Sequence, residues 1–78
     1  MPNKVDHLIK EDDPLLTRKA AVAYLNSLGL PMSFPWFEKL ALDGRGPPIE
    51  CYWGRYPMSR RSRVREWAES RMTPVEAA

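Results

Sequence analysis

Apolar side chains recur at helical spacing in three stretches of the chain. The first stretch carries apolar residues at intervals of three and four, namely Ala21, Tyr24, Leu25 and Leu28. Thr17 before this stretch is a good N-cap, and Gly29 after it can adopt the left-handed conformation that ends a helix. The pattern predicts a helix from Arg18 to about Leu28 with the apolar stripe buried.

The second stretch, from Ser33 to Asp43, is marked at both ends. Ser33 can accept a hydrogen bond from a free N–H group of the first turn, and Pro35 in that turn needs no hydrogen-bond partner. Gly44 is expected to end the helix. The predicted buried face consists of Trp36, Phe37, Leu40 and Ala41. A helix this short must pack against neighbours to be stable.

Between these helices and the third helical stretch, the sequence alternates as in a hairpin. Residues 49–53 predict one strand, Gly54 predicts a turn, and residues 55–58 predict a returning strand. Pro57 suits an edge strand, because proline cannot donate a hydrogen bond to a neighbouring strand. We therefore expect a small two-stranded hairpin.

The last helix is expected from Arg63 to Met72. Ser62 can cap it, and Ser59 is an alternative start one turn earlier. The residues expected to face inward are Val64, Trp67, Ala68 and Met72. Together the patterns predict a mainly α fold with a small β-hairpin.

The length of 78 residues favours one domain near the lower limit for a single core. We interpret residues 1–14 as a flexible or loosely docked arm, 15–72 as the folded domain and 73–78 as a loose tail. The chain has no apolar run of about 18 residues, and its beginning lacks the apolar core of a secretory signal. A cytoplasmic protein without a membrane partner is expected.

The net charge of +2 is modest, but the charges are unevenly distributed. Residues 1–13 are acidic on balance, whereas residues 54–72 carry six Arg against Glu66 and Glu69. Arg suits bidentate contact with phosphate, so this segment favours a polyanionic partner. The alternative is a solvated helix face with internal pairs such as Arg65 with Glu69, but those pairs would leave most of the Arg unpaired.

Candidate catalytic chemistry is scarce in this sequence. Cys51 is the only cysteine and His7 the only histidine, so neither a disulfide nor a cysteine-based zinc cluster is expected. No paired carboxylates lie on an apolar face, and the chain is short for a lined pocket. We expect no cofactor, no metal, no small-molecule substrate and no enzymatic activity.

Several short motifs occur in an order that is typical of one family. They are Leu15-Leu16-Thr17, Ala20-Ala21-Val22-Ala23-Tyr24-Leu25, Asp43-Gly44-Arg45-Gly46-Pro47-Pro48, Gly54-Arg55-Tyr56-Pro57-Met58, and Arg60-Arg61-Ser62 with Trp67 downstream. In combination they resemble the excisionase/AlpA-type winged helix-turn-helix family, which is related to the DNA-binding domains of MerR-type regulators. The resemblance covers residues 15–72.

The resemblance implies a winged helix-turn-helix with three helices and a two-stranded wing, in a small bacterial, nucleoid-associated protein that binds double-stranded DNA. The helix that begins at Ser33 would enter the major groove, and the wing around Gly54 and Arg55 would reach the minor groove or the backbone. Nine residues are candidates for DNA contact: Arg18, Lys19, Ser33, Phe34, Lys39, Arg45, Arg55, Arg60 and Arg61.

The sequence departs from the family along the helix expected to read the DNA. Members often place small polar residues and a Tyr-Arg pair there, whereas this chain has Phe34, Pro35 and Trp36. Direct base readout is therefore expected to be poor. Specificity would then come from DNA shape, from the wing, or from several protomers bound side by side.

Three functions follow as alternatives. The first is an excisionase, or recombination directionality factor, that binds adjacent sites cooperatively and bends DNA to promote excision by an integrase, which is a further candidate partner. The second is a transcriptional regulator of a mobile element or prophage with the same fold. The third, from a different class, is a protein-interaction adaptor that uses Phe34, Leu42, Trp53 and the acidic arm.

Overall fold

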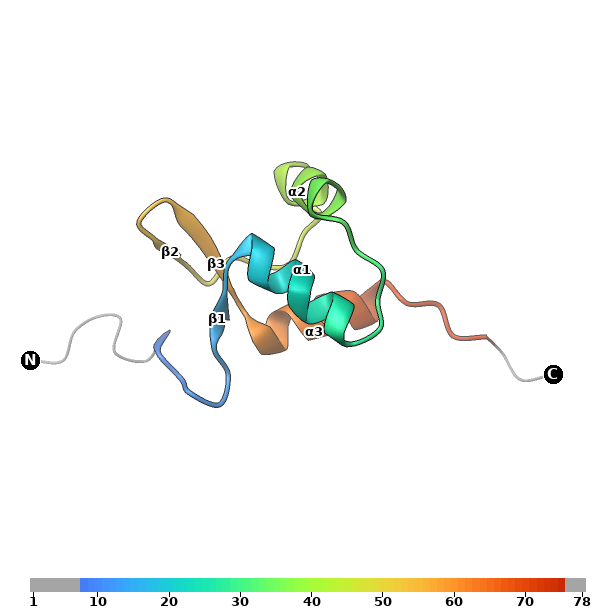
Figure 1. Ribbon diagram of the computed structural model, residues 1–78, viewed down its shortest axis with the longest axis horizontal. Coiled ribbons are helices and arrows are strands. Elements are labelled where there is room, and N and C mark those ends of the chain that lie inside the picture. Colours follow the sequence, from blue (N-terminus) through green and yellow to red (C-terminus); the bar gives the residue numbers. More distant parts are fainter. Residues whose placement is uncertain (1–7, 76–78) are drawn as a thin grey trace, which may run out of the picture.

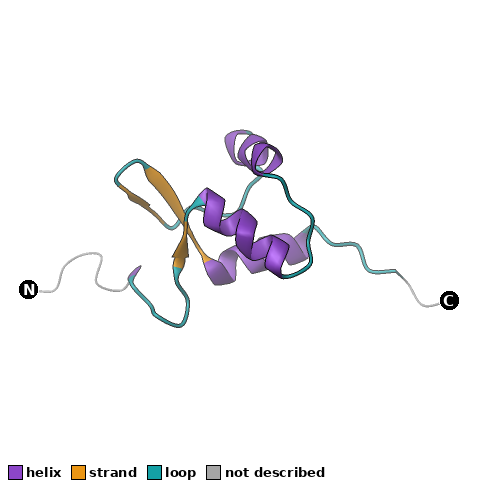
Figure 2. Cartoon of the chain, viewed as in Figure 1, coloured by secondary structure: helices purple, strands orange, loops and turns teal. Residues whose placement is uncertain are grey.

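The computed structural model describes residues 8–75 and contains three helices and a small three-stranded antiparallel sheet (Figure 1). In chain order the elements are β1 (Leu15–Leu16), α1 (Arg18–Ser27), α2 (Phe34–Leu42), β2 (Cys51–Trp53), β3 (Tyr56–Arg60) and α3 (Arg61–Ser70). The three predicted helices are thus present. The β2–β3 hairpin projects to one side of them, as the colouring by secondary structure in Figure 2 makes clear. Within residues 8–75, each helix is too short or too polar to cross a membrane.

The sheet has one more strand than the predicted two-stranded hairpin. Its order is β1-β3-β2, and Leu15 and Leu16 of β1 lie opposite Arg60 and Ser59 of β3. The two-residue strand β1 has no periodic pattern that could predict it. Pro57 belongs to the central strand and not to an edge, but β1 pairs only with the far end of β3. Pro57 therefore pairs with a strand on one side only. Its missing N–H is tolerated on the other side, where no strand needs a donor.

The ends of α1 and α2 follow the predicted capping chemistry. The side chains of Thr17 and Ser33 accept hydrogen bonds from the backbone N–H groups of Ala20 and Trp36. Each helix stops at a glycine with positive φ, +88° at Gly29 and +73° at Gly44. The two residues that follow each helix cap donate back to the helix in the 5→2 and 6→1 pattern of a Schellman motif.

The connection between α1 and α2 is fixed by one side chain that the sequence patterns do not single out. The amide of Asn26 donates to the carbonyl of Met32 and accepts from its N–H, both at 3.2 Å. Leu30 and Met32 of this connection pack against the core. The amide thereby replaces backbone pairing in the turn and holds the start of α2 relative to α1.

Helix α3 begins two residues earlier than predicted, and Ser62 does not cap it. The carboxylate of Asp13 accepts hydrogen bonds from the N–H of Ser62 at 2.9 Å and from its hydroxyl at 2.6 Å. The N–H of Arg61 donates to the carbonyl of Pro14. The first turn of α3 is therefore capped by a segment nearly 50 residues away in the sequence, which no local pattern can indicate.

The core lies between the three helices. Its buried apolar residues are Ala21, Val22, Leu25, Phe37, Val64 and Ala68, with Leu40 also buried on α2. Trp67 is half-buried and packs edge-on against Phe37, with ring centroids 5.7 Å apart. Its indole N–H donates to the carbonyl of Arg45, which ties α3 to the loop after α2.

Three residues predicted to be buried are exposed. Trp36 is 47% exposed because it lies at the margin of the α2 face whose centre is Phe37 and Leu40. Leu28 and Met72 are 45% and 49% exposed, because α1 and α3 end before them and the chain turns away.

Candidate nucleic-acid interface

A groove forms where three separate parts of the chain meet: the N-terminal ends of α1 and α2 and the tip of the β2–β3 hairpin. Its lining residues are Thr17, Arg18, Lys19, Phe34, Glu38, Arg55, Tyr56 and Pro57. Four of the nine candidate DNA-contacting residues are among them, namely Arg18, Lys19, Phe34 and Arg55. The three cations outnumber the single carboxylate of Glu38, so the groove carries a net positive charge.

The three cations differ in how available they are. Lys19 lies exposed on the first turn of α1, and Arg55 lies exposed in the hairpin turn. Arg18 is half-buried, and one of its guanidinium nitrogens lies 3.9 Å from a carboxylate oxygen of Glu38. Lys19 and Arg55 are therefore the cations with the freest side chains, and Arg18 must share its charge with α2.

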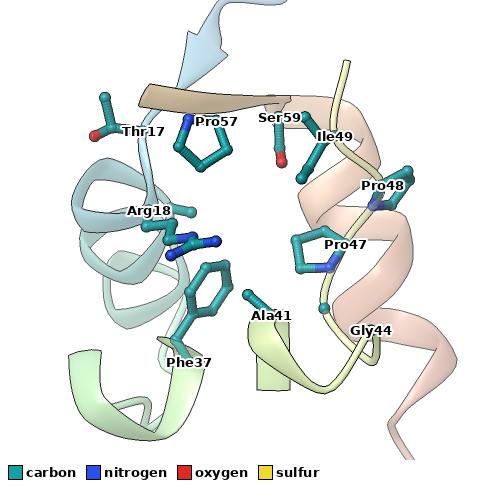
Figure 3. Close-up of a pocket in the computed structure, with 12 residues that line it drawn as sticks. Thr17, Arg18, Phe37, Ala41, Gly44, Pro47, Pro48, Ile49, Pro57 and Ser59 are labelled. Carbon is teal, nitrogen blue, oxygen red and sulfur yellow. The ribbon is translucent and has the colours of Figure 1, made fainter. Parts of the chain in front are cut away.

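Arg18 also borders an apolar cavity of about 240 Å³, which shares Thr17, Arg18 and Pro57 with the groove (Figure 3). Its side chain extends over the ring of Phe37, and Pro47 and Ile49 lie on the opposite side. Arg18 thus contributes a long side chain to a mainly apolar wall, as cationic side chains commonly do. The cavity wall is largely aliphatic and aromatic, which suits packing better than the binding of a polar substrate.

Both helix starts at the groove favour a negatively charged partner. The first turns of α1 and α2 contain no acidic residue, and α1 begins instead with Arg18 and Lys19. Cations at a helix N-terminus oppose the helix dipole, at a cost of about 0.3–1 kcal/mol each. Ser33 accepts one N–H bond from α2, and its hydroxyl hydrogen remains able to donate to phosphate.

The remaining candidates on and after α2 are dispersed. Phe34 is half-buried and packs partly against the core, so its packing role accompanies its place in the groove. Lys39 is exposed in the last turn of α2. Arg45 is exposed beyond the end of α2, where its carbonyl is held by Trp67. Neither Lys39 nor Arg45 lines the groove.

Arg60 and Arg61 lie away from the groove and bind the segment before β1. Arg60 is only 4% exposed, and its guanidinium donates to the carbonyls of Leu8 and Asp13 at 2.7 and 2.9 Å. Arg61 donates to the carbonyl of Asp12 at 2.8 Å. In this structure the guanidinium groups of both Arg residues therefore hold the chain's own backbone.

The same segment was expected to be a flexible or loosely docked arm. From Leu8 to Pro14 it is held against β3 and the start of α3, whereas residues 1–7 lie outside the described residues. The pKa of the Asp13 carboxyl is lowered, first by the hydrogen bond from the Ser62 side chain, then by the Ser62 N–H, Arg60 and Arg61, against the opposing effect of burial.

Four residues of the groove were not among the candidates for DNA contact, namely Thr17, Glu38, Tyr56 and Pro57. Tyr56 follows Arg55 and lies opposite Trp53 across the hairpin, so pairing the two strands around Gly54 would have placed it at the tip. Glu38 lies four residues after Phe34, which is one helical turn along the same face.

Residues 8–75 contain no cluster of three His, Cys, Asp or Glu side chains that could hold a metal ion. Comparison with known protein families, curated proteins and solved structures found no match for this chain.

Proposed function

We propose that this protein binds double-stranded DNA as a winged helix-turn-helix, with the groove between α1, α2 and the hairpin as its binding face. The observation that carries the proposal is the convergence of Arg18, Lys19 and Arg55 from two distant parts of the sequence on one groove. In this arrangement α2 enters the major groove, the hairpin reaches the neighbouring minor groove, and the start of α1 lies over the phosphate backbone.

The surface of α2 supports a particular mode of recognition. Its outward residues include Trp36, Lys39 and Leu42, of which only Lys39 carries a charged donor for a guanine edge. One such helix carries little base-specific information. We therefore propose that several protomers bind adjacent sites and bend the DNA, as an excisionase does to direct an integrase, because bending of about 20–30 base pairs costs on the order of 1–6 kcal/mol.

The first test is a gel shift with the pure protein. The DNA should come from either side of the protein's own gene and from any neighbouring integrase attachment site, at several salt concentrations. A ladder of complexes on direct repeats, with bending, supports the excisionase role. One complex on a promoter supports a regulator with the same fold instead. The absence of binding at low salt contradicts both and favours the adaptor.

Substitutions locate the binding face. Lys19→Ala and Arg55→Ala should each weaken DNA binding and reduce the slope of log K against log salt by about 0.9, the value for one lost phosphate contact. Arg61→Ala is the matched control, because Arg61 donates to the carbonyl of Asp12 outside the groove. A loss of affinity in Arg61→Ala equal to that in Arg55→Ala would show that the groove is not the binding face.

A further inference from the structure

The tip of the β2–β3 hairpin presents aromatic surface that the fold does not use. Trp53 is 74% exposed and Tyr56 is 60% exposed. The two residues lie directly opposite each other in the strand register, so their side chains are on the same face of the hairpin. Tyr52, the preceding residue, is 66% exposed on the other face.

The position of this aromatic pair is fixed. Trp53 and Tyr56 flank a turn of only two residues, Gly54 and Arg55. Gly54 has φ of +61°, and no non-glycine residue of the described chain has a positive φ, which is the pattern of a type II′ turn. Such a turn matches the twist of the strands and keeps the tip narrow. The two rings are therefore carried at the end of a stiff projection.

The surroundings of the pair indicate the kind of surface that it meets. Arg55 lies in the turn between the two aromatic residues, and with Tyr56 it also lines the cationic groove. Arg55 and Tyr56 make the tip continuous with the groove, so the tip would meet the same polyanionic partner as Arg18 and Lys19. A flat ring beside an Arg fits a nucleic acid, because the phosphates attract the cation and the bases offer flat faces.

We propose that Trp53, supported by Tyr56, wedges into a base step of double-stranded DNA and kinks it. This inference rests on the proposed function and names the part of the protein that bends the DNA. Arg55 would bring the hairpin tip into the narrow groove, and the indole would partly unstack one base step, as apolar wedges do in architectural proteins. Flexible pyrimidine–purine steps would be the preferred sites, because they cost the least to unstack.

The experiment measures bending and unstacking separately from binding. The DNA fragment that shifts in the gel assay is labelled at its ends for energy transfer, and 2-aminopurine is placed in turn at each step of the bound duplex. Wild-type protein should shorten the end-to-end distance and raise 2-aminopurine fluorescence at one step per protomer. Trp53→Ala should abolish both signals and weaken binding by about 5- to 150-fold, the range for loss of one stacked aromatic.

Two further variants make the result specific. Trp53→Phe keeps an aromatic wedge and should retain most of the bend, whereas Tyr56→Ala should reduce it. Leu28→Ala is the matched control, because Leu28 is an exposed apolar residue at the far end of α1. Circular dichroism should show native folding for all variants, since these side chains are exposed.

Each outcome bears on a different claim. Loss of bending and of the 2-aminopurine signal in Trp53→Ala, with retention in Trp53→Phe and Leu28→Ala, supports the wedge. A Trp53→Ala protein that still binds and still bends the DNA overturns the wedge and leaves DNA binding intact. A variant that bends DNA but loses the higher complexes of the ladder also overturns it, because the tip would then contact another protomer. Wild-type protein that does not shift DNA overturns the proposed function itself.

Discussion

Two sets of basic residues in this molecule look alike in the sequence and differ in the structure. Arg60 and Arg61 precede and begin α3, and Arg18 and Lys19 begin α1. At α3 the guanidinium groups donate hydrogen bonds to carbonyls of residues 8–13. The carboxylate of Asp13 accepts a hydrogen bond from a backbone N–H in the first turn of the helix. At α1 no acidic residue lies in the first turn, and Lys19 is exposed.

The difference teaches that excess charge in a segment of sequence is a poor guide to charge on a surface. The two pairs expected within the segment 54–72 form and leave its other Arg residues without a Glu of the segment, but most of these are engaged elsewhere. Arg60 and Arg61 bind backbone carbonyls, and Arg63 and Arg65 pair with Glu66 and Glu69 one helical turn away. Arg71 stacks on Trp67, 5.4 Å from the ring centre. Arg55, in contrast, lies exposed at the hairpin tip.

The largest effect that tests this comparison is expected from Arg60→Ala. The substitution leaves the carbonyls of Leu8 and Asp13 without their donor and removes a buried side chain. The free energy of unfolding should fall by about 3 kcal/mol, as for the loss of charge-assisted hydrogen bonds. In a domain of this size the melting temperature should fall by roughly 12–24 °C, measured by circular dichroism.

Arg55→Ala is the matched control for Arg60→Ala. Arg55 is exposed, so its substitution should change the free energy of unfolding by less than about 0.5 kcal/mol while weakening DNA binding. The comparison fails if the two variants melt alike, because Arg60 would then have no structural role beyond that of a surface residue.

The next largest effect is expected at Asp13, whose carboxylate should make the free energy of unfolding depend on pH. Since the folded state lowers the pKa of Asp13 below its ordinary 3.8, the contribution of its carboxylate is complete above that value. It is lost as the pH falls through the folded-state pKa. Thermal melts of wild type and Asp13→Asn should therefore differ most near neutral pH and converge as the pH falls below 3.8 and through the lowered pKa of Asp13.

Ser62→Ala provides an independent check on the same contact. The Ser62 hydroxyl donates to Asp13 at 2.6 Å and is the largest cause of the lowered pKa. Without it, the pKa of Asp13 should lie closer to its ordinary value, so the acid-induced loss of stability should be smaller and be complete at a higher pH than in the wild type. For the Asp13→Asn variant, a difference in melting temperature from wild type that stays constant with pH would show that the carboxylate charge does not contribute to stability.

The elements that the sequence predicts well are those whose signals are local. Gly29 and Gly44 end their helices with the expected left-handed conformation, and Thr17 and Ser33 cap the starts. Each signal lies within a few residues of the structure that it determines, because a cap or a left-handed glycine acts through the adjacent turn. The hairpin turn at Gly54 is confirmed for the same reason.

The features that the sequence does not reveal depend on contacts between distant residues. Strand β1 has only two residues and exists through its pairing with β3. The early start of α3 and the burial of Arg60 both depend on the segment from Leu8 to Pro14, about 50 residues earlier. The candidate groove lies between these two cases. The sequence indicates that Lys19 and Arg55 are exposed basic residues, but it does not show that they lie in one groove, because that depends on the tertiary fold.

The smallest effect on both stability and DNA affinity is expected from Arg65→Ala. Arg65 donates to Glu69 at 3.0 Å on the exposed side of α3, one helical turn apart, and does not line the groove. Exposed pairs of this kind contribute little to stability, so the melting temperature should change by less than about 4 °C. DNA affinity should stay within about twofold of wild type, because a paired Arg releases few counterions on binding.

Arg55→Ala, measured beside it at the same salt concentration, removes the same charge from the hairpin tip. If Arg65→Ala weakens DNA binding as much as Arg55→Ala does, the basic face of α3 belongs to the interface, and total charge rather than the groove determines where DNA binds.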